Sequence, residues 1–589
     1  MRITTTLLFS VATLMPYGRM PAQATHVGAV QSDSDLVGLW GHESISGPQV
    51  RGEISLRHYR GVWIVNVAGF ETTAAVAHDT LSFSLPGGQG EFRSPVPLSH
   101  DLAVRGFWIQ PQGQLQARYA SLVTLTRITS NLWRGTVEPL DERWSLYLSI
   151  EKQPDGSLTG YFRNPDANWR GGASAFRVVR DRDTLRFLDV ASGRQRNSVV
   201  YDSAQHQIVM DFGRQVILTP RTRAQAVGFF PRTPATSPYS YRAPEPRRDD
   251  GWPTARGHDV GLNEAKLAAL VREIEETNPV APNAPAIHSL LVARHGKLVL
   301  EEYFAGYDAT RVHDLRSASK TFTSVMLGVA MHQKKLIDPN TLVYASFPNT
   351  GKLVAADPRR AQLTLGNLLT HSSGLACDDN DDASPGNEDR MQSQTTQPDW
   401  YRYTLELPVL HEPGTSYAYC SAGLNLAAGV IAHATQSWLP AFFDRTIAQP
   451  LEIDHYSINL TPTGQMYGGG GVQMRPRDLL KFGQLYLDGG TWNGHRIVDR
   501  SWVEASTSHQ IDNPNGSDGF AWHRFTLEAN GRHYQEYEAS GNGGQFLIVV
   551  PELDITVVIT AGNYGQYGIW RTFREQLVPR YVLAAADGA

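Results

Sequence analysis

A serine and a lysine stand three residues apart in the run Ser-Ala-Ser-Lys at 317–320. This S-x-x-K spacing is used by serine acyl-transfer enzymes. Apolar residues repeat at helical spacing after it, so we expect Ser317 to open a helix and Lys320 to share its face. A neutral lysine amine could then take the serine proton, and the helix N-terminus could stabilise an oxyanion. Because an unperturbed lysine has a pKa of about 10.4, we expect burial or nearby positive charge to depress the pKa of Lys320.

The spacing alone is a weak signal, because Ser149 and Lys152 also match it. That pair lies in an alternating apolar and polar run, which predicts a β-strand. Positions i and i+3 of a strand point to opposite faces. Ser317 therefore remains the candidate nucleophile.

A second candidate group is Tyr419 with Ser421, in a turn-rich segment at 413–421 that leads into an apolar helix. A tyrosine and a hydroxyl two residues apart on such a loop can both face a cleft. The phenol has an ordinary pKa of about 10, so a lysine ammonium nearby could help to make it a tyrosinate base. The alternative is structural: Tyr419 is a half-buried aromatic residue and Ser421 caps the helix.

A third segment contains Ser540, Gly541 and Asn542 and precedes an apolar strand at 546–550. Gly541, Gly543 and Gly544 permit the backbone to approach a ligand closely. The alternative interpretation is a loop with a β-bulge.

Five blocks between about 260 and 565 resemble the serine β-lactamase-related family, in the family's order. This family includes class C β-lactamases, penicillin-binding DD-peptidases, family carboxylesterases and aminohexanoate-dimer hydrolases. The blocks are Arg-Ser-Ala-Ser-Lys-Thr-Phe-Thr at 316–323, Leu-Leu-Thr-His-Ser-Ser-Gly-Leu at 368–375, the segment 413–421, three glycines at 468–470 followed by Pro-Arg-Asp-Leu at 476–479, and Gly-Asn-Gly-Gly-Gln at 541–545.

The resemblance implies an antiparallel sheet flanked by helices, with an all-helical lobe on one side of a cleft. It also implies that Ser317 is the nucleophile, that Lys320 and Tyr419 form a coupled base, and that water hydrolyses an acyl-enzyme without a cofactor. The oxyanion hole would use the backbone N–H groups of Ser317 and Asn542, with Ser421, Ser540 and Gly541 beside the substrate.

Two departures from the family pattern bear on the substrate. The second motif usually reads Y-x-N but here ends in Ser421, and the third usually begins with Lys or His but here begins with Ala539. A missing cation removes a charge-assisted contact to a substrate carboxylate, worth about 1.5–3 kcal/mol. We therefore expect a carboxylic ester or short amide as substrate, although an arginine elsewhere in the cleft could supply the charge. The alternatives are a penicillin-recognising or peptidoglycan-binding protein with little turnover, or a true β-lactamase.

The chain has two cysteines, Cys377 and Cys420. They form either a disulfide or two buried free thiols, because connectivity depends on geometry. The resemblance places both in segments that flank the cleft, which favours a bridge that would brace Tyr419. A run rich in acidic residues at 378–389 is best explained as solvated surface, with a cation site or selection of a cationic substrate as the alternatives.

The elements that must position these residues change in character along the chain. Residues 36–222 show short alternating runs, which predict an all-β module, a barrel or a sandwich. Three ordered matches suggest that this module has two related halves. They pair Trp40 with Trp133, the run Asp-Thr-Leu-Ser-Phe at 79–83 with Asp-Thr-Leu-Arg-Phe at 183–187, and Leu125 with Leu218. A Pro-rich linker is expected at 223–256, and a C-terminal α/β domain of the β-lactamase type at 257–589. Strands at both ends of that domain predict an antiparallel sheet with a helical insertion.

Residues 1–24 resemble a signal peptide, with Arg2, an apolar stretch and an Ala-Gln-Ala cleavage site at 22–24. We therefore expect a secreted or periplasmic protein that has no membrane span once the signal is removed. The formal net charge of −5 is small for 589 residues, which argues against a nucleic-acid partner. No G-x-S-x-G, H-E-x-x-H, paired C-x-x-C, P-loop or Rossmann motif is present, so we expect no metal or cofactor. The expected partners are a small-molecule or short peptide-like substrate and, through the β-rich module, cell-wall material.

Overall fold

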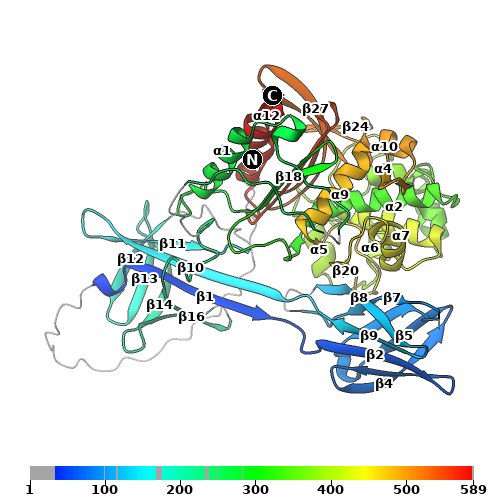
Figure 1. The fold of residues 1–589 in the computed structure, drawn as a ribbon, viewed down its shortest axis with the longest axis horizontal. Helices are drawn as coiled ribbons and strands as arrows, with labels where there is room; N and C mark the ends of the chain where they lie inside the picture. The colour runs from blue at the N-terminus through cyan, green and yellow to red at the C-terminus, as the bar shows by residue number, and fades with distance from the viewer. Residues whose placement is uncertain are drawn as a thin grey trace.

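The computed structural model describes residues 33–98, 100–113, 117–166, 175–211, 213–232, 238–247, 250–281 and 283–586, and the expected signal peptide lies outside them. Two β-barrels lie beneath a mixed α/β domain (Figure 1). Among the described residues, no helix has the length and apolar character needed to cross a bilayer.

Each barrel contains eight antiparallel strands, so the all-β prediction for 36–222 is confirmed and the module is a pair of barrels. The first barrel comprises β2 (Gly52–Tyr59), β3 (Val62–Val67), β4 (Phe70–Ala77), β5 (Thr80–Ser84), β6 (Glu91–Pro95), β7 (Ala103–Ile109), β8 (Arg118–Thr129) and β9 (Leu132–Val137). The second comprises β1 (Gly38–Ser46), β10 (Glu142–Lys152), β11 (Leu158–Arg163), β12 (Phe176–Asp181), β13 (Thr184–Asp189), β14 (Gln195–Asp202), β15 (Gln207–Asp211) and β16 (Gln215–Arg221). Each barrel encloses its own apolar core.

The two barrels exchange one strand. β1 precedes the first barrel in sequence but pairs with β10 and β16 of the second. Conversely, β9 leads into the second barrel but pairs with β2 and β8 of the first. Trp40 and Trp133 lie on these two exchanged strands, and Leu125 and Leu218 lie on β8 and β16, the last strand of each repeat. The matched runs at 79–83 and 183–187 likewise fall on β5 and β13, so the prediction of two related halves is confirmed.

The C-terminal domain is built on an eight-stranded antiparallel sheet in the order β18-β17-β29-β28-β27-β26-β25-β24. Its strands are β17 (Ile287–Arg294), β18 (Lys297–Tyr303), β24 (Ile511–Asn513), β25 (Gly516–Asp518), β26 (His523–Ala529), β27 (Arg532–Gly541), β28 (Gln545–Val550) and β29 (Ile555–Ala561). Strands from both ends of the domain meet where β17 pairs with β29, as the sequence predicts.

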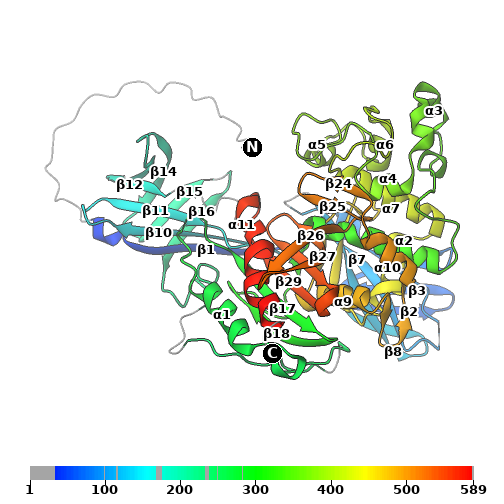
Figure 2. The same cartoon turned by 90° about the horizontal axis from the view of Figure 1, so that it is seen from above.

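Helices cover both faces of this sheet (Figure 2). One apolar core joins it to α1 (Glu264–Glu275) and η9 (Phe573–Leu583), and another joins it to α2 (Lys320–His332) and α9 (Pro476–Leu487). The remaining α-helices are α3 (Gly351–Ala356), α4 (Leu365–Leu369), α5 (Glu388–Ser393), α6 (Trp400–Glu406), α7 (Ser421–Thr435), α8 (Leu439–Phe443), α10 (Arg500–Thr507), α11 (Tyr567–Thr572) and α12 (Ala584–Ala586). The segment between β18 and β24 is thus the predicted helical insertion.

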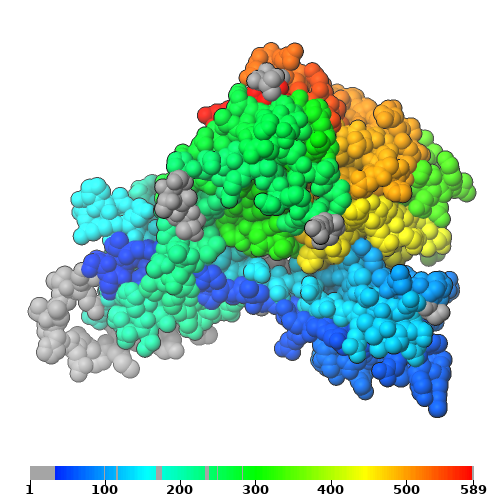
Figure 3. Space-filling view, viewed as in Figure 1, coloured from blue at the N-terminus to red at the C-terminus, as the bar shows by residue number. Residues whose placement is uncertain are grey.

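The barrels are attached to this domain through backbone pairing as well as side chains. β20 (Tyr456–Leu460) of the C-terminal domain pairs with β8, and β21 (Val472–Met474) and β19 (His313–Asp314) extend that sheet toward the turn at 316–319. The first barrel therefore lies directly against the part of the domain that contains β20 (Figure 3). In the expected linker, the buried Trp252 packs into the domain and Thr254 bridges to β18.

Candidate active site

Ser317 lies in the 3₁₀ turn η4 (Arg316–Ser319), and Lys320 is the first residue of α2. Lys320 is buried, and its Nζ donates hydrogen bonds to Ser317 Oγ at 2.9 Å and to the Gly469 carbonyl at 2.7 Å. The S-x-x-K spacing thus places the amine on the Ser317 hydroxyl through one helical turn. The glycine-rich segment at 468–470 supplies the second acceptor, which fixes the orientation of the amine.

Tyr419 comes from the loop before α7 and meets the other two side chains. Lys320 Nζ lies 4.9 Å from the centroid of the Tyr419 ring. Hydrogen bonds to Ser317 and Lys320 both lower the pKa of the Tyr419 phenol. A hydroxyl, an amine and a phenol from distant segments therefore lie in one cluster.

The protonation of Lys320 differs from the expectation drawn from the sequence. Burial does lower the pKa of Lys320, but the Tyr419 phenol and the carboxylates of Glu388 and Asp379 raise it, and the net direction is upward. Lys320 is therefore an ammonium that donates to Ser317. The Tyr419 pKa is also raised, because burial outweighs the favourable influence of Lys320.

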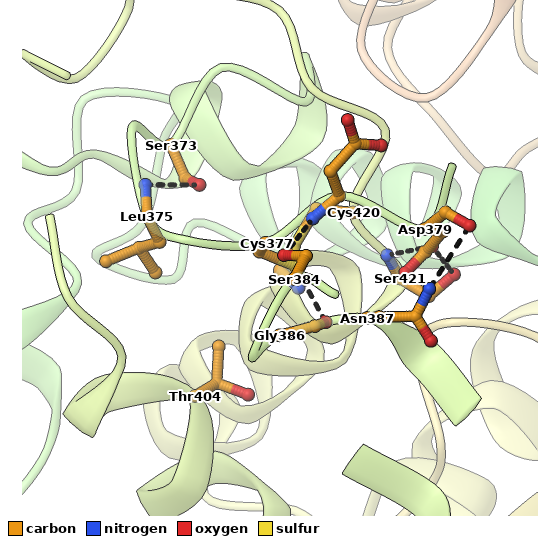
Figure 4. The surroundings of a disulfide bond; sticks show 12 residues. Ser373, Leu375, Cys377, Asp379, Ser384, Gly386, Asn387, Thr404, Cys420 and Ser421 are labelled. Atoms are coloured by element: carbon orange, nitrogen blue, oxygen red, sulfur yellow. Dashed lines mark hydrogen bonds between the residues drawn. A yellow bond between two sulfur atoms is a disulfide. The ribbon is translucent and has the colours of Figure 1, made fainter. Parts of the chain in front are cut away.

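The carboxylate of Asp379 reaches into the site from the acidic run, which therefore is not all solvated surface. Its Oδ2 accepts from the backbone N–H and the hydroxyl of Ser421, at 2.8 and 2.6 Å (Figure 4). Its Oδ1 accepts from the Glu388 N–H at 2.8 Å. Burial and the neighbouring Glu388 raise the pKa of Asp379 to about 6.

Ser421 is fully buried, so the exposed part of this pair is the carboxylate of Asp379. Ser421 is the first residue of α7, and Cys420 occupies the N-cap position instead. The structure thus places Ser421 behind Asp379 and out of direct reach of a substrate. Nothing in the local sequence joins these two residues, which are 42 positions apart.

Cys377 and Cys420 form a disulfide, with their Cα atoms 5.4 Å apart. Each cysteine lies close in sequence to a residue of the site. Asp379 follows Cys377 by two positions, and Tyr419 directly precedes Cys420. The Asp379 backbone N–H also donates to the Tyr419 carbonyl at 2.8 Å. The bridge therefore joins the acidic run to the segment 413–421 that contains Tyr419, here called the tyrosine loop.

The third motif ends β27 directly against the nucleophile turn. A Cβ added to Gly541 would lie 2.4 Å from the Leu315 carbonyl oxygen, so only glycine fits there without displacement. This close approach brings the exposed Asn542 beside η4, where its side-chain Oδ1 accepts from the Gly565 N–H at 2.8 Å. Ser540 is partly exposed, whereas Ala539 is buried, so the third motif places no cation in the cleft.

Two histidines beside Tyr419 were not predicted as site residues. The His371 ring packs 4.4 Å from the Tyr419 ring, and its Nδ1 accepts from the Cys420 N–H at 3.0 Å. Burial lowers the pKa of His371 to about 3, so this ring is neutral. His523 lies on the other wall, 6.3 Å from Tyr419 between ring centroids. His371 belongs to the block at 368–375 that resembles the family, so the sequence offered a signal for it. The sequence around His523 offers no such signal.

A large groove, of about 1130 Å³, separates the barrels from the C-terminal domain. Tyr119 of β8 and Glu142 of β10 line its barrel side, and Arg316 and Tyr564 line its other side. Arg316 is the residue before the nucleophile. The β-module therefore forms one wall of a cavity that reaches the turn bearing Ser317.

A model of the family described as Beta-lactamase matches residues 284–568. This segment is a β-lactamase-family domain. The blocks that carry the resemblance all lie within it, and so do the residues clustered around Ser317.

The chain is similar to a curated enzyme and to several solved structures. A 6-aminohexanoate-dimer hydrolase from Paenarthrobacter ureafaciens is 26% identical over 269 residues, which cover 44% of this chain and 64% of that enzyme. A family VIII carboxylesterase structure shares 17% identity with a TM-score of 0.42, covering 57% of this chain and 98% of its own. A D-amino acid amidase from Ochrobactrum anthropi SV3 shares 16% identity with a TM-score of 0.39, covering 51% of this chain and 93% of its own.

Proposed function

We propose that this protein is an exported serine hydrolase that cleaves a carboxylic ester or an amide through an acyl-enzyme on Ser317. The observation that carries the proposal is the contact of Lys320 Nζ with Ser317 Oγ at 2.9 Å, beside the Tyr419 phenol. Nucleophilic catalysis by serine requires a base within hydrogen-bonding reach of the hydroxyl.

Tyr419 is the base in this mechanism, because the Lys320 ammonium already donates to Ser317. Ser317 Oγ attacks the substrate carbonyl carbon while its proton passes to Tyr419 in the phenolate form, which Lys320 favours against the opposing effect of burial. The negative charge that develops on the carbonyl oxygen is met by the N–H groups of Ser317 and Asn542. Tyr419 then gives the proton to the leaving alcohol or amine, and the Ser317 ester remains.

Water completes the reaction by the same route in reverse. Tyr419 takes a proton from water, the hydroxide oxygen attacks the acyl carbon, and the proton returns to Ser317 Oγ as the acid leaves. Asp379 and Glu388 hold Lys320 in its charged form throughout, so that Lys320 stabilises the phenolate in both half-reactions.

An ester or amide is favoured over a β-lactam because Ala539 is buried where the related enzymes place a cation. We also propose that the groove of about 1130 Å³ receives the part of the substrate beyond the scissile bond, such as a cell-wall fragment. Its volume and the charged residues that line it from both domains support this, since drug-sized ligands occupy pockets of roughly 300–1,000 Å³.

Labelling with a fluorophosphonate, followed by intact-mass analysis, tests the nucleophile. The wild type should gain one adduct and Ser317→Ala none, and retention of the adduct would move the nucleophile elsewhere. Steady turnover of a p-nitrophenyl ester or anilide distinguishes a hydrolase from a penicillin-recognising protein, which would give a single burst. Nitrocefin turnover faster than ester turnover would identify a β-lactamase.

A further inference from the structure

His523 and Asp518 form an ion pair beside Tyr419, on the side of the cleft made by the sheet. His523 opens β26, and its Nδ1 donates to Asp518 Oδ1 at 2.7 Å. Asn513 donates to the same oxygen at 2.8 Å. The Asp518 side chain is 2% exposed and the His523 side chain 22%, so a buried carboxylate holds a partly accessible imidazole.

This imidazole is oriented along Tyr419. The His523 and Tyr419 rings are tilted by 29° with their centroids 6.3 Å apart. Lys320 Nζ is 4.9 Å from the same phenol ring. An imidazolium at His523 is therefore a second positive charge near the proposed base, with 6.3 Å between the two ring centroids.

We propose that His523, held by Asp518, is a positioning residue that favours the phenolate form of Tyr419 during the reaction. This inference rests on the proposed function, in which Tyr419 takes the proton from Ser317. His523 does so through its charge, because opposite charges a few ångströms apart stabilise one another most strongly where water is excluded.

The groups around His523 favour its charged form. Burial lowers its pKa, but Asp518 on β25 and Glu538 on β27 raise it against Arg574 on η9, and the net direction is upward. Asp518 remains ionised, because His523 and the hydrogen bond from Asn513 lower its pKa against the effect of burial. Tyr417 from the tyrosine loop hydrogen-bonds to Asp518 as well, so the pair is anchored from both sides of the cleft.

The test compares His523→Gln with the wild type and with a matched control. His509→Gln is that control: His509 pairs with Asp512 at 2.9 Å on the same edge of the sheet, but both side chains are more than half exposed, at 54% and 88%. kcat and KM are measured with a p-nitrophenyl ester from pH 5 to pH 10. Fluorophosphonate titration of Ser317 gives the concentration of folded enzyme in each sample.

At pH 7 we expect kcat per titrated site to fall about tenfold in His523→Gln, as for a phenol whose pKa rises by about one unit. KM should change less than about twofold, since substrate is not the partner of His523. The deficit should shrink as pH rises, because Tyr419 then ionises in both proteins and His523 loses its charge in the wild type. His523→Lys should restore most of the rate at pH 7, and Asp518→Asn should lower it.

Superimposable pH profiles for His523→Gln and the wild type would overturn the inference, and so would a change confined to KM. If His523→Gln does not fold, the His523→Lys and Asp518→Asn profiles decide in the same way. Failure of the proposed function looks different: Ser317→Ala would keep its activity or its adduct, whatever His523 does.

Discussion

Ser421 donates both its backbone N–H and its hydroxyl to one oxygen of Asp379, at 2.8 and 2.6 Å. The second motif of this chain is therefore made by two residues, a short buried serine and an aspartate that extends beyond it. In place of the neutral amide of the usual motif, the cleft receives a carboxylate. Against burial, the pKa of Lys320 is raised by Tyr419 first and then by Glu388 and that carboxylate.

The first prediction concerns the pH dependence of stability at Asp379. Its pKa is about 6 in the folded protein against an ordinary value of 3.8. A carboxyl with a raised folded pKa weakens the folded state once it ionises, so this contribution is lost as pH rises from about 4 to about 6. From pH 4.5 to pH 7.5, the free energy of unfolding of the wild type should therefore fall by about 2 kcal/mol relative to that of Asp379→Asn.

Urea unfolding at the two pH values measures this difference. Asp382→Asn, an exposed position in the same acidic run, is the control and should follow the wild type. Parallel behaviour of Asp379→Asn and the wild type would contradict the prediction.

The second prediction concerns the base. Tyr419→Phe removes one oxygen and leaves the ring against His371. Because general-base catalysis typically contributes about 10²–10⁴-fold, kcat for ester hydrolysis should fall by that factor with little change in KM. A variant that keeps a third or more of the wild-type kcat would show that another group takes the proton.

The third prediction concerns the contact between β27 and the nucleophile turn. Gly541→Ala places a methyl group 2.4 Å from the Leu315 carbonyl oxygen and must displace η4 or the strand. A shift of about 1 Å at a reacting group can cost about 10²-fold, so we expect a loss of that order in kcat. Gly568→Ala is the matched control, since no atom lies within 4 Å of its Cβ position. Equal activity of the two variants would count against the oxyanion role of this segment.

The fourth prediction concerns the disulfide, which closes a loop with a sequence separation of 43. Loop-closure entropy gives an upper estimate of about 4 kcal/mol for such a bridge. The double variant Cys377→Ser with Cys420→Ser should unfold at lower denaturant and lose activity, because Tyr419 adjoins Cys420. Alkylation of both thiols in the native, unreduced protein would disprove the bridge itself.

The motifs predicted the cluster of Ser317, Lys320 and Tyr419 but not the other side chains that join it. Ser317 and Lys320 are brought together by one helical turn, so their contact follows from local geometry. Tyr419 and Gly541 required the family resemblance, because their approach depends on the whole domain. Asp379 was assigned to solvated surface, since only the bridge and the fold of the run at 378–389 bring it onto Ser421.

The protonation of Lys320 was wrong for a related reason. Burial acts in the predicted direction, but the groups that reverse it are Tyr419, Glu388 and Asp379, which lie about 60 to 100 residues along the chain. Such long-range electrostatics leave no pattern near Lys320. In the β-module the alternation of side chains predicted strands correctly, but the similar patterns of the two halves could not show which barrel each strand would join.

The exchange of β1 and β9 between the barrels determines the order in which the two barrels of the β-module can close. When synthesis has reached the end of β8, the first barrel still lacks β9. The strand made first, β1, has no partner strands yet, because β10 and β16 of the second barrel follow later in the chain. The first barrel closes only when β9 has been made, and the second closes only when β16 has followed, because it takes β1 from the start of the module. A fragment that ends after β8, or one that begins at β9, should therefore leave a barrel without one of its strands.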